Sequence, residues 1–290
     1  MYLPRKILEE KLQELLGEDI GHGDITSSLT ISENLVVEAE IVAKERCIVA
    51  GLEEATILCE DLNLTVTAHT DDGSQANAEA RLLRIVGDPR TILSAERTLL
   101  NLLSRMSGIA TITNHLVSKI RSAGYETRVA ATRKVAPGLS YFDKKAVLLG
   151  GGDTHRICLD DLILIKDNHV KITGSIHEAV RRVRENASFS KKIEIEVRSL
   201  DEALKAAEAN VDIIMLDNFS PGKVKEAVAI LKNERVAERV LLEASGGITE
   251  NNVVEYAASG VDIISLGRIT QSPKAIDMSL EVVKVNKTRT

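Results

Sequence analysis

The pattern of hydrophobic positions differs between the first and second parts of the chain. The first part begins with leucines at helical spacing. The leucines of Leu8–Leu16 recur at helical spacing, with Pro4 before them and Gly17 after them. Proline fits the first turn of a helix and glycine commonly follows the last one, so we predict a short helix that Gly17 ends.

The rest of the first pattern is a group of β-type runs followed by a long helical stretch. The runs are residues 35–52, 64–69 and 81–87, with the turn-forming sequence DDGS among them. They predict an antiparallel sheet. From the Asp-Pro pair at residues 88–89, apolar side chains recur at helical spacing as far as Ile120, which predicts one long helix.

After Gly124 the pattern changes to short apolar runs that alternate with segments of helix length. The runs are residues 126–132, 162–167, 192–197, 212–217, 239–245 and 261–267. Repeated strand and helix units predict a parallel sheet covered by helices. With six runs visible, we predict an incomplete α/β barrel preceded by an α+β domain.

Composition and charge exclude several classes of function. The chain has 290 residues and a formal net charge of -6, which argues against a nucleic-acid-binding protein held by phosphate neutralisation. No apolar run approaches the roughly 20 residues of a membrane helix, and residues 1–18 lack the apolar core of a signal peptide. We therefore expect no membrane partner and a cytoplasmic location. The unpaired spacing of the three cysteines predicts buried free thiols.

Polar residues follow each predicted strand of the second half, where barrel active sites are built. Cations are prominent among them: Arg133, Lys134, His155, Arg156 and Lys166. In a protein of negative net charge, this convergence predicts a site for a polyanionic small molecule. For any one of these residues, the alternative is a solvated loop residue or an ion-pair partner.

Carboxylates form the second group of candidates. Glu194 and Glu196 are two residues apart on one predicted strand, so both face the barrel interior. Glu196 and Asp217 of the next strand could hold Mg²⁺ or bind ribose hydroxyls. The alternative is an internal salt bridge to Lys134 or Lys166, which we prefer for Glu194.

Two further features of the sequence bear on the site: glycines at two strand ends, and the absence of a nucleophile motif. The segments Ser245–Ile248 and Ser265–Arg268 end the last two predicted strands, where backbone N–H groups can bind phosphate. The chain has no P-loop, G-x-S-x-G or H-E-x-x-H motif. Lys166 at a strand end leaves open a Schiff-base lyase.

Several segments together resemble the quinolinate phosphoribosyltransferase family. They are ATRKVAPGL (131–139), GGGDTHR (150–156), LIKDNH (164–169), IEIEV (193–197), LDN (216–218) and EASGGI (243–248), with EDIGHGDITS (18–27), IVAGL (48–52) and AERTLLNLLSRMSGIAT (95–111) in the first half. The resemblance covers nearly the whole chain.

This resemblance implies the domain organisation and the assembly. It implies an N-terminal α+β sandwich domain at residues 1–112, a seven-stranded incomplete α/β barrel at 113–272, and a tail at about 273–290 that returns to the first domain. It also implies a homodimer, with a hexamer as a further option, in which Arg97 reaches the partner's barrel.

The implied reaction joins quinolinate to 5-phosphoribosyl 1-pyrophosphate with Mg²⁺, giving nicotinate mononucleotide, pyrophosphate and CO₂ in NAD biosynthesis. Quinolinate binding falls to Arg97, Thr132, Arg133, His155, Arg156 and Lys166. Binding of the phosphoribosyl donor falls to Lys134, Glu196, Asp217, Ser245, Gly246, Gly247, Leu266, Gly267 and Arg268. The catalytic residues are Lys134, Lys166, Glu196 and Asp217, and the metal ligands are Glu196 and Asp217.

Two departures from the family pattern bear on the substrate. Val135 and Ser140 stand where the family usually has Thr and Arg, so one cation near the first strand is missing. Arg268 stands where a small residue is more usual. The remaining alternatives are a paralogue that ribosylates nicotinate or another aromatic acid, and a non-catalytic phosphosugar-binding protein.

Overall fold

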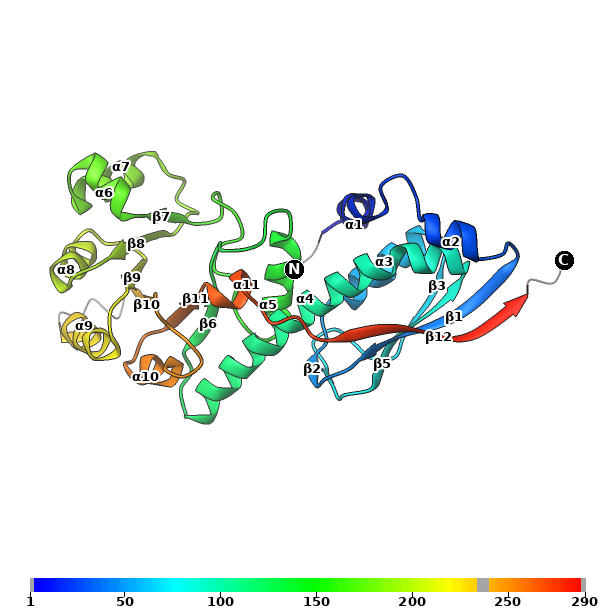
Figure 1. Ribbon diagram of the computed structural model, residues 1–290. Coiled ribbons are helices and arrows are strands. Elements are labelled where there is room, and N and C mark those ends of the chain that lie inside the picture. Colours follow the sequence, from blue (N-terminus) through cyan, green and yellow to red (C-terminus); the bar gives the residue numbers. More distant parts are fainter. Residues whose placement is uncertain (1–2, 234–239, 288–290) are drawn as a thin grey trace. The chain divides into compact units, whose positions relative to one another are not determined.

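The computed structural model describes residues 3–233 and 240–287. The chain forms two compact units (Figure 1). Unit 1 holds the chain up to Ile112, residues 148–150 and the chain from Pro273 onward, and unit 2 holds Thr113–Val147 and Gly151–Ser272. No helix of the described residues is both long and apolar enough to cross a membrane.

Unit 1 begins with helix α1 (Arg5–Ile20), whose buried stripe is Leu8, Leu12 and Leu16. The prediction that Gly17 ends this helix is wrong. The helix continues to Ile20 and ends at Gly21, which has a φ of 56° and donates its N–H to the Gly17 carbonyl at 3.2 Å. A left-handed φ is what the end of the helix requires, and only Gly21 supplies it.

The antiparallel sheet predicted for the first half is confirmed. Its strand order is β12-β1-β5-β3, with the bounds β1 Leu35–Ala43, β3 Thr65–Ala68, β5 Ala80–Gly87 and β12 Met278–Lys287. Strand β12, which no sequence run predicted, pairs with the whole length of β1. The run after Ala43 does not join this sheet, since β2 (Cys47–Ile48) pairs with β4 (Gln75–Ala76) separately.

The helices of unit 1 include the predicted long one. They are α2 (Ile25–Thr30), α3 (Leu52–Asp61) and α4 (Pro89–Ser122), and α4 is a single helix of 34 residues. Gly108 lets the tail pass close to α4, because a Cβ at this position would lie 2.1 Å from the Lys274 carbonyl oxygen. Cys47 and Cys59 are buried free thiols as predicted, whereas Cys158 of unit 2 is exposed and the prediction is wrong there.

Unit 2 is built on a parallel sheet with the order β6-β11-β10-β9-β8-β7. All six predicted runs form strands: β6 Arg128–Ala131, β7 Ile163–Ile165, β8 Ile193–Val197, β9 Ile213–Asp217, β10 Leu241–Ser245 and β11 Ile263–Leu266. A seventh strand is absent from the described residues. In its place, Asp153 makes a single parallel bridge to Ala130 of β6.

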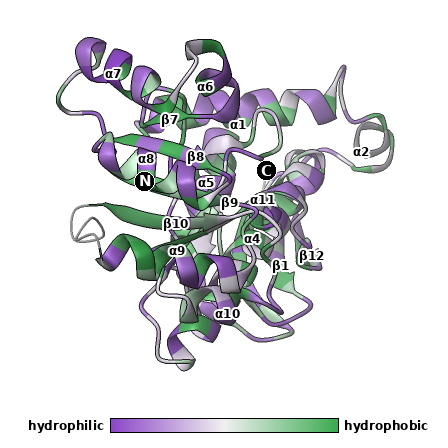
Figure 2. Ribbon diagram, turned by 90° about the vertical axis from the view of Figure 1, so that its left-hand side faces the viewer, coloured by the Kyte–Doolittle hydropathy of each residue, from purple (hydrophilic) through white to green (hydrophobic). Residues whose placement is uncertain are grey.

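Helices follow the strands of unit 2 and cover one face of the sheet (Figure 1). Their bounds are α5 Ser140–Leu149, α6 Asp167–Thr173, α7 Ile176–Asn186, α8 Leu200–Glu208, α9 Pro221–Asn233, α10 Val253–Ala258 and α11 Arg268–Gln271. Strands β7, β8 and β10 are mainly hydrophobic and α7 is mainly hydrophilic (Figure 2). Alternation along each strand sends one set of side chains to the helices and leaves the other set for the opposite face, which carries the site.

Candidate active site

A cavity of about 680 Å³ lies at the carboxyl ends of the parallel strands. Its lining includes every residue predicted for the site except Arg97: Thr132, Arg133, Lys134, His155, Arg156, Lys166, Glu196, Asp217, Ser245, Gly246, Gly247, Leu266, Gly267 and Arg268. Sites of parallel α/β folds are expected at this edge, since helix-connected strands leave their loops free there.

The register of the sheet explains which side chains form the floor of the cavity and which lie nearer its mouth. Glu196, Met215 and Glu243 are paired in one row across β8, β9 and β10. Two residues further along the strands, Asp217 and Ser245 are paired in the next row. Residues two apart on a strand share a face, so both rows lie on one face of the sheet.

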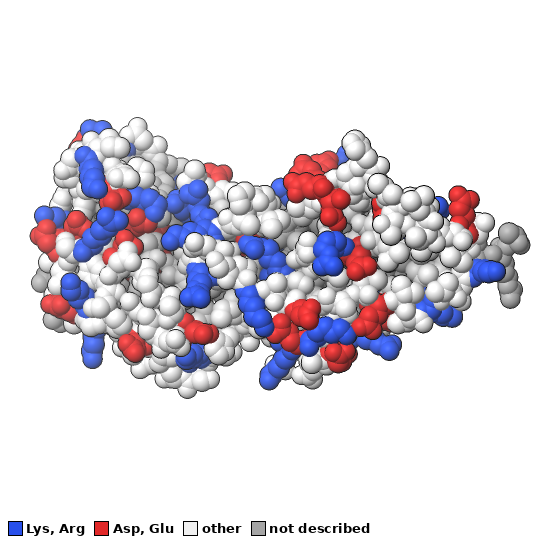
Figure 3. All heavy atoms as spheres, in the orientation of Figure 1, with Lys and Arg blue, Asp and Glu red and all other residues white. Residues whose placement is uncertain are grey.

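The cations of the cavity come from the loops that follow β6 and precede β7. Arg133 and Lys134 are exposed, whereas Arg156 is buried with only 6% of its surface exposed. Burial lowers the pKa of Arg156, and the positive charge of Arg133 lowers it further. Like charges thus gather in the cavity, although basic and acidic side chains are interspersed over the face of the molecule in Figure 3. The cation cluster is a local feature.

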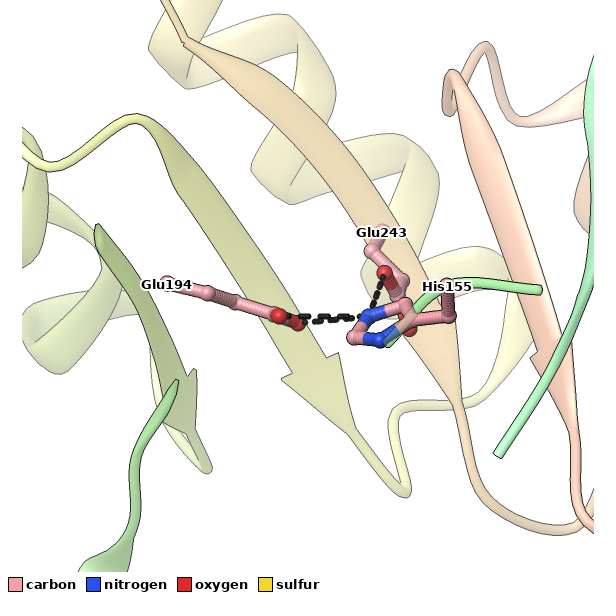
Figure 4. Close-up of side chains that lie close together, drawn as sticks. All are labelled: His155, Glu194 and Glu243. Carbon is pink, nitrogen blue, oxygen red and sulfur yellow. Dashed lines mark hydrogen bonds and ion pairs between the residues drawn. The ribbon is translucent and has the colours of Figure 1, made fainter. Parts of the chain in front are cut away.

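His155 lies between two buried carboxylates (Figure 4). Its Nε2 atom is 3.1 Å from Oε2 of Glu194 and 3.1 Å from Oε2 of Glu243, and both glutamates are fully buried. Burial alone would lower the pKa of the imidazole, but the hydrogen bonds to Glu194 and Glu243 outweigh it and raise the pKa to about 10. Burial also raises the pKa of Glu194, so this cluster retains protons to a higher pH than its separate groups would.

Glu194 therefore has a different partner from the one we expected. The prediction of a salt bridge to Lys134 or Lys166 is wrong, because Glu194 pairs with His155. Lys166 instead forms an ion pair with Glu196. Glu194 lies one row deeper in the sheet than Glu196 and is opposite Leu164 of β7, one residue short of the end of that strand.

Asp217 and Glu196 both line the cavity, and each already accepts a hydrogen bond from a cation. Oε1 of Glu196 accepts from Lys166, and Oδ2 of Asp217 accepts from Nε of Arg198 at 3.3 Å. The backbone N–H of Lys166 donates to Nδ1 of His169 at 2.8 Å, which fixes the start of α6. The strand ends thus fix two adjacent carboxylates, each with a second oxygen outside its ion pair.

Glycines form the wall of the cavity after β10 and β11. Gly246 has a φ of +92°, and a Cβ there would lie 2.3 Å from Oδ1 of Asn218. At Gly267 a Cβ would lie 2.9 Å from Cδ of Lys134. A side chain is thus excluded at Gly246, and one at Gly267 would displace the Lys134 side chain, so the backbone itself faces the cavity at both positions. Exposed N–H groups of this kind suit a phosphate.

Several lining residues escaped the sequence analysis. Glu243 is fully buried, and its Oε1 atom has no hydrogen-bond partner among the described residues. The buried Oγ of Ser265, a residue of the predicted phosphate-binding segment Ser265–Arg268, likewise has none in the part of the chain described. The two-residue spacing of Glu243 and Ser245 on one strand was the available signal, since it places both side chains on the same face. Asn218 and Gln271 also line the cavity, and their spacing gives no comparable signal.

Arg97 belongs to α4 in unit 1, where its side chain is exposed. Among the described residues it has neither an ion pair nor a hydrogen bond through its side chain. An unpartnered exposed arginine is available to a second molecule, and its predicted role in a partner's site stays a prediction.

The fold and the cavity define an α/β barrel enzyme whose site is suited to a phosphorylated, polyanionic small molecule. Sequence models of the quinolinate phosphoribosyl transferase family match the chain, the N-terminal domain over residues 24–107 and the C-terminal domain over residues 109–281. The chain therefore belongs to the quinolinate phosphoribosyl transferase family.

Individual relatives agree over nearly the whole chain. A probable nicotinate-nucleotide pyrophosphorylase (carboxylating) of Methanocaldococcus jannaschii is 47% identical over 281 residues, which are 96% of this chain and 97% of that protein. The nicotinate-nucleotide pyrophosphorylase (carboxylating) of Homo sapiens is 38% identical, covering 84% of this chain and 82% of that one. The solved structure of the nicotinate-nucleotide pyrophosphorylase from Francisella tularensis has a TM-score of 0.89 at 41% identity, covering 97% and 98% of the two chains.

Proposed function

We propose that this protein transfers the phosphoribosyl group of 5-phosphoribosyl 1-pyrophosphate to quinolinate and releases CO₂, which gives nicotinate mononucleotide and pyrophosphate for NAD biosynthesis. The observation that carries this proposal is one cavity that combines clustered cations, paired carboxylates and a side-chain-free glycine wall. The named relatives supply the particular reaction, and the cavity supplies groups suited to each part of it.

The quinolinate dicarboxylate is assigned to the cations of the loops before β7 and after β6. Arg133 and Arg156 repel each other, so a dianion between them relieves the repulsion and gains charge-assisted hydrogen bonds. Lys166 and His155 complete the cation set around Thr132. We also propose a homodimer in which Arg97 of the partner subunit adds a further cation, because this arginine is exposed and has no ion pair with any residue that the structure describes.

The phosphoribosyl donor is assigned to the opposite wall. The backbone of Ser245–Gly247 and Leu266–Arg268 would hold the 5-phosphate, because the glycines expose N–H groups there. Lys134 contacts this wall, since the Thr270 hydroxyl donates to its carbonyl at 2.8 Å and its side chain packs on Gly267. We assign the Lys134 ammonium to the pyrophosphate.

Glu196 and Asp217 fit Mg²⁺ as the required cation. Carboxylate oxygens on adjacent strand ends are suitable ligands, and each residue keeps one oxygen outside its ion pair with Lys166 or Arg198. Magnesium sites that serve phosphate substrates use one or two such carboxylates. When bound, the ion would neutralise charge on the leaving pyrophosphate.

No enzyme nucleophile is needed. The pyridine nitrogen of quinolinate attacks C1 of the ribose while the bond to pyrophosphate breaks, and the cavity residues position both partners and stabilise charge. The pyridinium ring then accepts the electron pair of the breaking bond to the adjacent carboxylate, CO₂ leaves, and a proton replaces it. Lys166, the lysine that a Schiff-base lyase would use, is held in an ion pair with Glu196.

The test is a product assay by mass spectrometry on the purified protein with Mg²⁺ and 5-phosphoribosyl 1-pyrophosphate. Quinolinate and nicotinate are offered in separate tubes, and CO₂ release is followed. Nicotinate mononucleotide and CO₂ from quinolinate alone are expected. Product from nicotinate alone would reassign the substrate to the paralogue class, and no product from either would leave a binding protein.

A further inference from the structure

The cluster of His155, Glu194 and Glu243 has no role in the reaction as assigned so far beyond the imidazole itself. The ring approaches two strands at once, with Nε2 3.1 Å from Glu243 of β10 and 3.1 to 3.3 Å from the two oxygens of Glu194 of β8 (Figure 4). Ionised carboxylate oxygens only accept hydrogen bonds. With both glutamates ionised, Nε2 carries the proton that faces them.

Burial makes the charge of this ring consequential. Both glutamates are fully buried, and the His155 side chain is 9% exposed. Ionised carboxylates in such a place need compensating cations. The cation of Arg156 also interacts electrostatically with Glu194, so among these four side chains one cation would face two carboxylates if His155 were neutral. With His155 as imidazolium, the four side chains balance.

The backbone fixes the ring in this position. His155 has a φ of 55°, an uncommon value for a residue other than glycine. Its N–H donates to Oδ1 of Asp153 at 2.8 Å, and Asp153 bridges to Ala130 of β6. The Thr154 carbonyl accepts from the buried ammonium of Lys144 on α5. Strain at a residue held by neighbours on three sides is typical of a functional position.

We propose that Glu194 and Glu243 are positioning residues that keep His155 as an imidazolium with a fixed orientation at the floor of the cavity. His155 and Glu243 line the cavity, whereas Glu194 lies behind them. This inference rests on the proposed function in one respect: the imidazolium supplies a permanent positive charge to the bound dicarboxylate. The charge then persists at pH values where a free imidazole, with a pKa near 6.5, is neutral.

The kinetic test uses Glu243→Gln and Glu194→Gln, which keep the size of the side chain and remove its charge. Each change weakens the hold on the imidazole proton, so His155 loses its charge as the pH rises from about 6.5 to 8.5. We expect the ratio of variant to wild-type KM for quinolinate to rise about tenfold over this range. The ratio of kcat values should change much less. Lys166 and the arginines of the cavity are present in the wild type and in both variants. The ratio of variant to wild-type KM therefore cancels their contribution.

Glu40→Gln is the matched control. Glu40 is a buried glutamate of unit 1 whose Oε2 lies 3.0 Å from Nε2 of His69, so it has the same chemical contact in a place that does not line the cavity. Its KM for quinolinate should follow the wild-type pH profile. Parallel profiles for Glu243→Gln and the wild type would overturn the proposal.

A second measurement does not depend on turnover and reads the wild-type protein directly. Nitrogen-15 NMR of the histidine rings, with His155 assigned by its loss in His155→Gln, reports whether both ring nitrogens carry protons. We expect an imidazolium at pH 8 in the wild-type protein. A neutral ring at pH 8 would refute the inference even if the enzyme converts quinolinate. An imidazolium in a protein that makes no product would refute the proposed function alone and keep the positioning role.

Discussion

The two units use charged residues in opposite ways. Beside the antiparallel sheet of unit 1, Nζ of Lys44, just after β1, lies 3.0 Å from Oε2 of Glu79, just before β5, and 2.8 Å from Oε1 of Glu281 of β12, so opposite charges are paired. At the strand ends of unit 2, like charges lie together: Arg133 beside Arg156 and Glu194 beside Glu243.

Two lysines show the difference most directly. Hydrogen bonds to Glu281 and Glu79 raise the pKa of the partly exposed Lys44. Burial lowers the pKa of Lys144, which is fully buried, to about 8. Placing like charges close together opposes folding, and so does removing a charged side chain from water. The comparison teaches that unit 2 retains an arrangement that an anionic substrate would stabilise, whereas Lys44 of unit 1 is paired within the protein itself.

The largest effect is expected from Arg133→Ala. Loss of a cation that binds a carboxylate directly should raise the KM for quinolinate about 100-fold, while the melting temperature without substrate stays equal or rises because repulsion with Arg156 is removed. Steady-state kinetics and thermal unfolding measure the two. Arg128→Ala, on strand β6 just before Arg133 but outside the cavity lining, should keep the wild-type KM. A variant of Arg133 with lower stability and normal KM would contradict the comparison.

Glu196→Ala is expected to act on the other substrate. Removing this carboxylate takes away a proposed Mg²⁺ ligand, so kcat/KM for 5-phosphoribosyl 1-pyrophosphate should fall by about two orders of magnitude. The KM for quinolinate should change by less than about threefold, because Lys166 remains. Initial rates with each substrate varied in turn decide this. Equal losses for both substrates would argue that Glu196 serves only to hold Lys166.

Lys144→Met tests the buried charge through stability. The pKa of Lys144 is about 8 in the folded protein and 10.5 as its ordinary value, so the unfolded chain binds the proton more tightly. The full penalty is present below pH 8 and disappears as the pH rises toward 10.5. The free energy of unfolding of the wild type, relative to that of the variant, should therefore rise by on the order of 3 kcal/mol between pH 7 and pH 10.5. Urea unfolding at both pH values measures it, and a difference independent of pH would show that burial does not strain this lysine.

The smallest effect is expected on the sheet of unit 1. Glu38→Gln removes a carboxylate that pairs with Arg84 and Lys284 on the neighbouring strands. Pairs of this exposure contribute little to stability, so the urea midpoint should remain within error of the wild-type value. Enzymatic activity should also be unchanged. A marked loss of stability or of activity in Glu38→Gln would contradict the difference between the charged residues of the two units.

The sequence predicted the elements of unit 2 better than the contacts between them. Each of its six strands is a short β-type run bounded by turn residues, and this signal is local. The partner of Glu194 was missed because it is set by a loop that brings His155 across two strands, which no spacing along the chain reveals. Glu243 could have been found from its spacing to Ser245.

The misses in unit 1 have a similar cause. β12 has the composition of a strand only in part, with charged residues at several positions, and it is a strand because β1 offers it an edge. Gly17 was mistaken for a helix end because a glycine in open space imposes nothing on the backbone. The residues predicted for the site, apart from Arg97, line one cavity, and their roles in binding and catalysis stay predictions.

The pairing of β12 with β1 has a consequence for biosynthesis. During translation β1 leaves the ribosome well before its partner β12 at Met278–Lys287. All six parallel strands of unit 2 emerge in between. Until β12 is synthesised, one edge of β1 is an unpaired strand edge, the kind of edge that chaperones protect and neighbouring chains can capture. The antiparallel sheet is therefore completed only after every strand of the parallel sheet has been made.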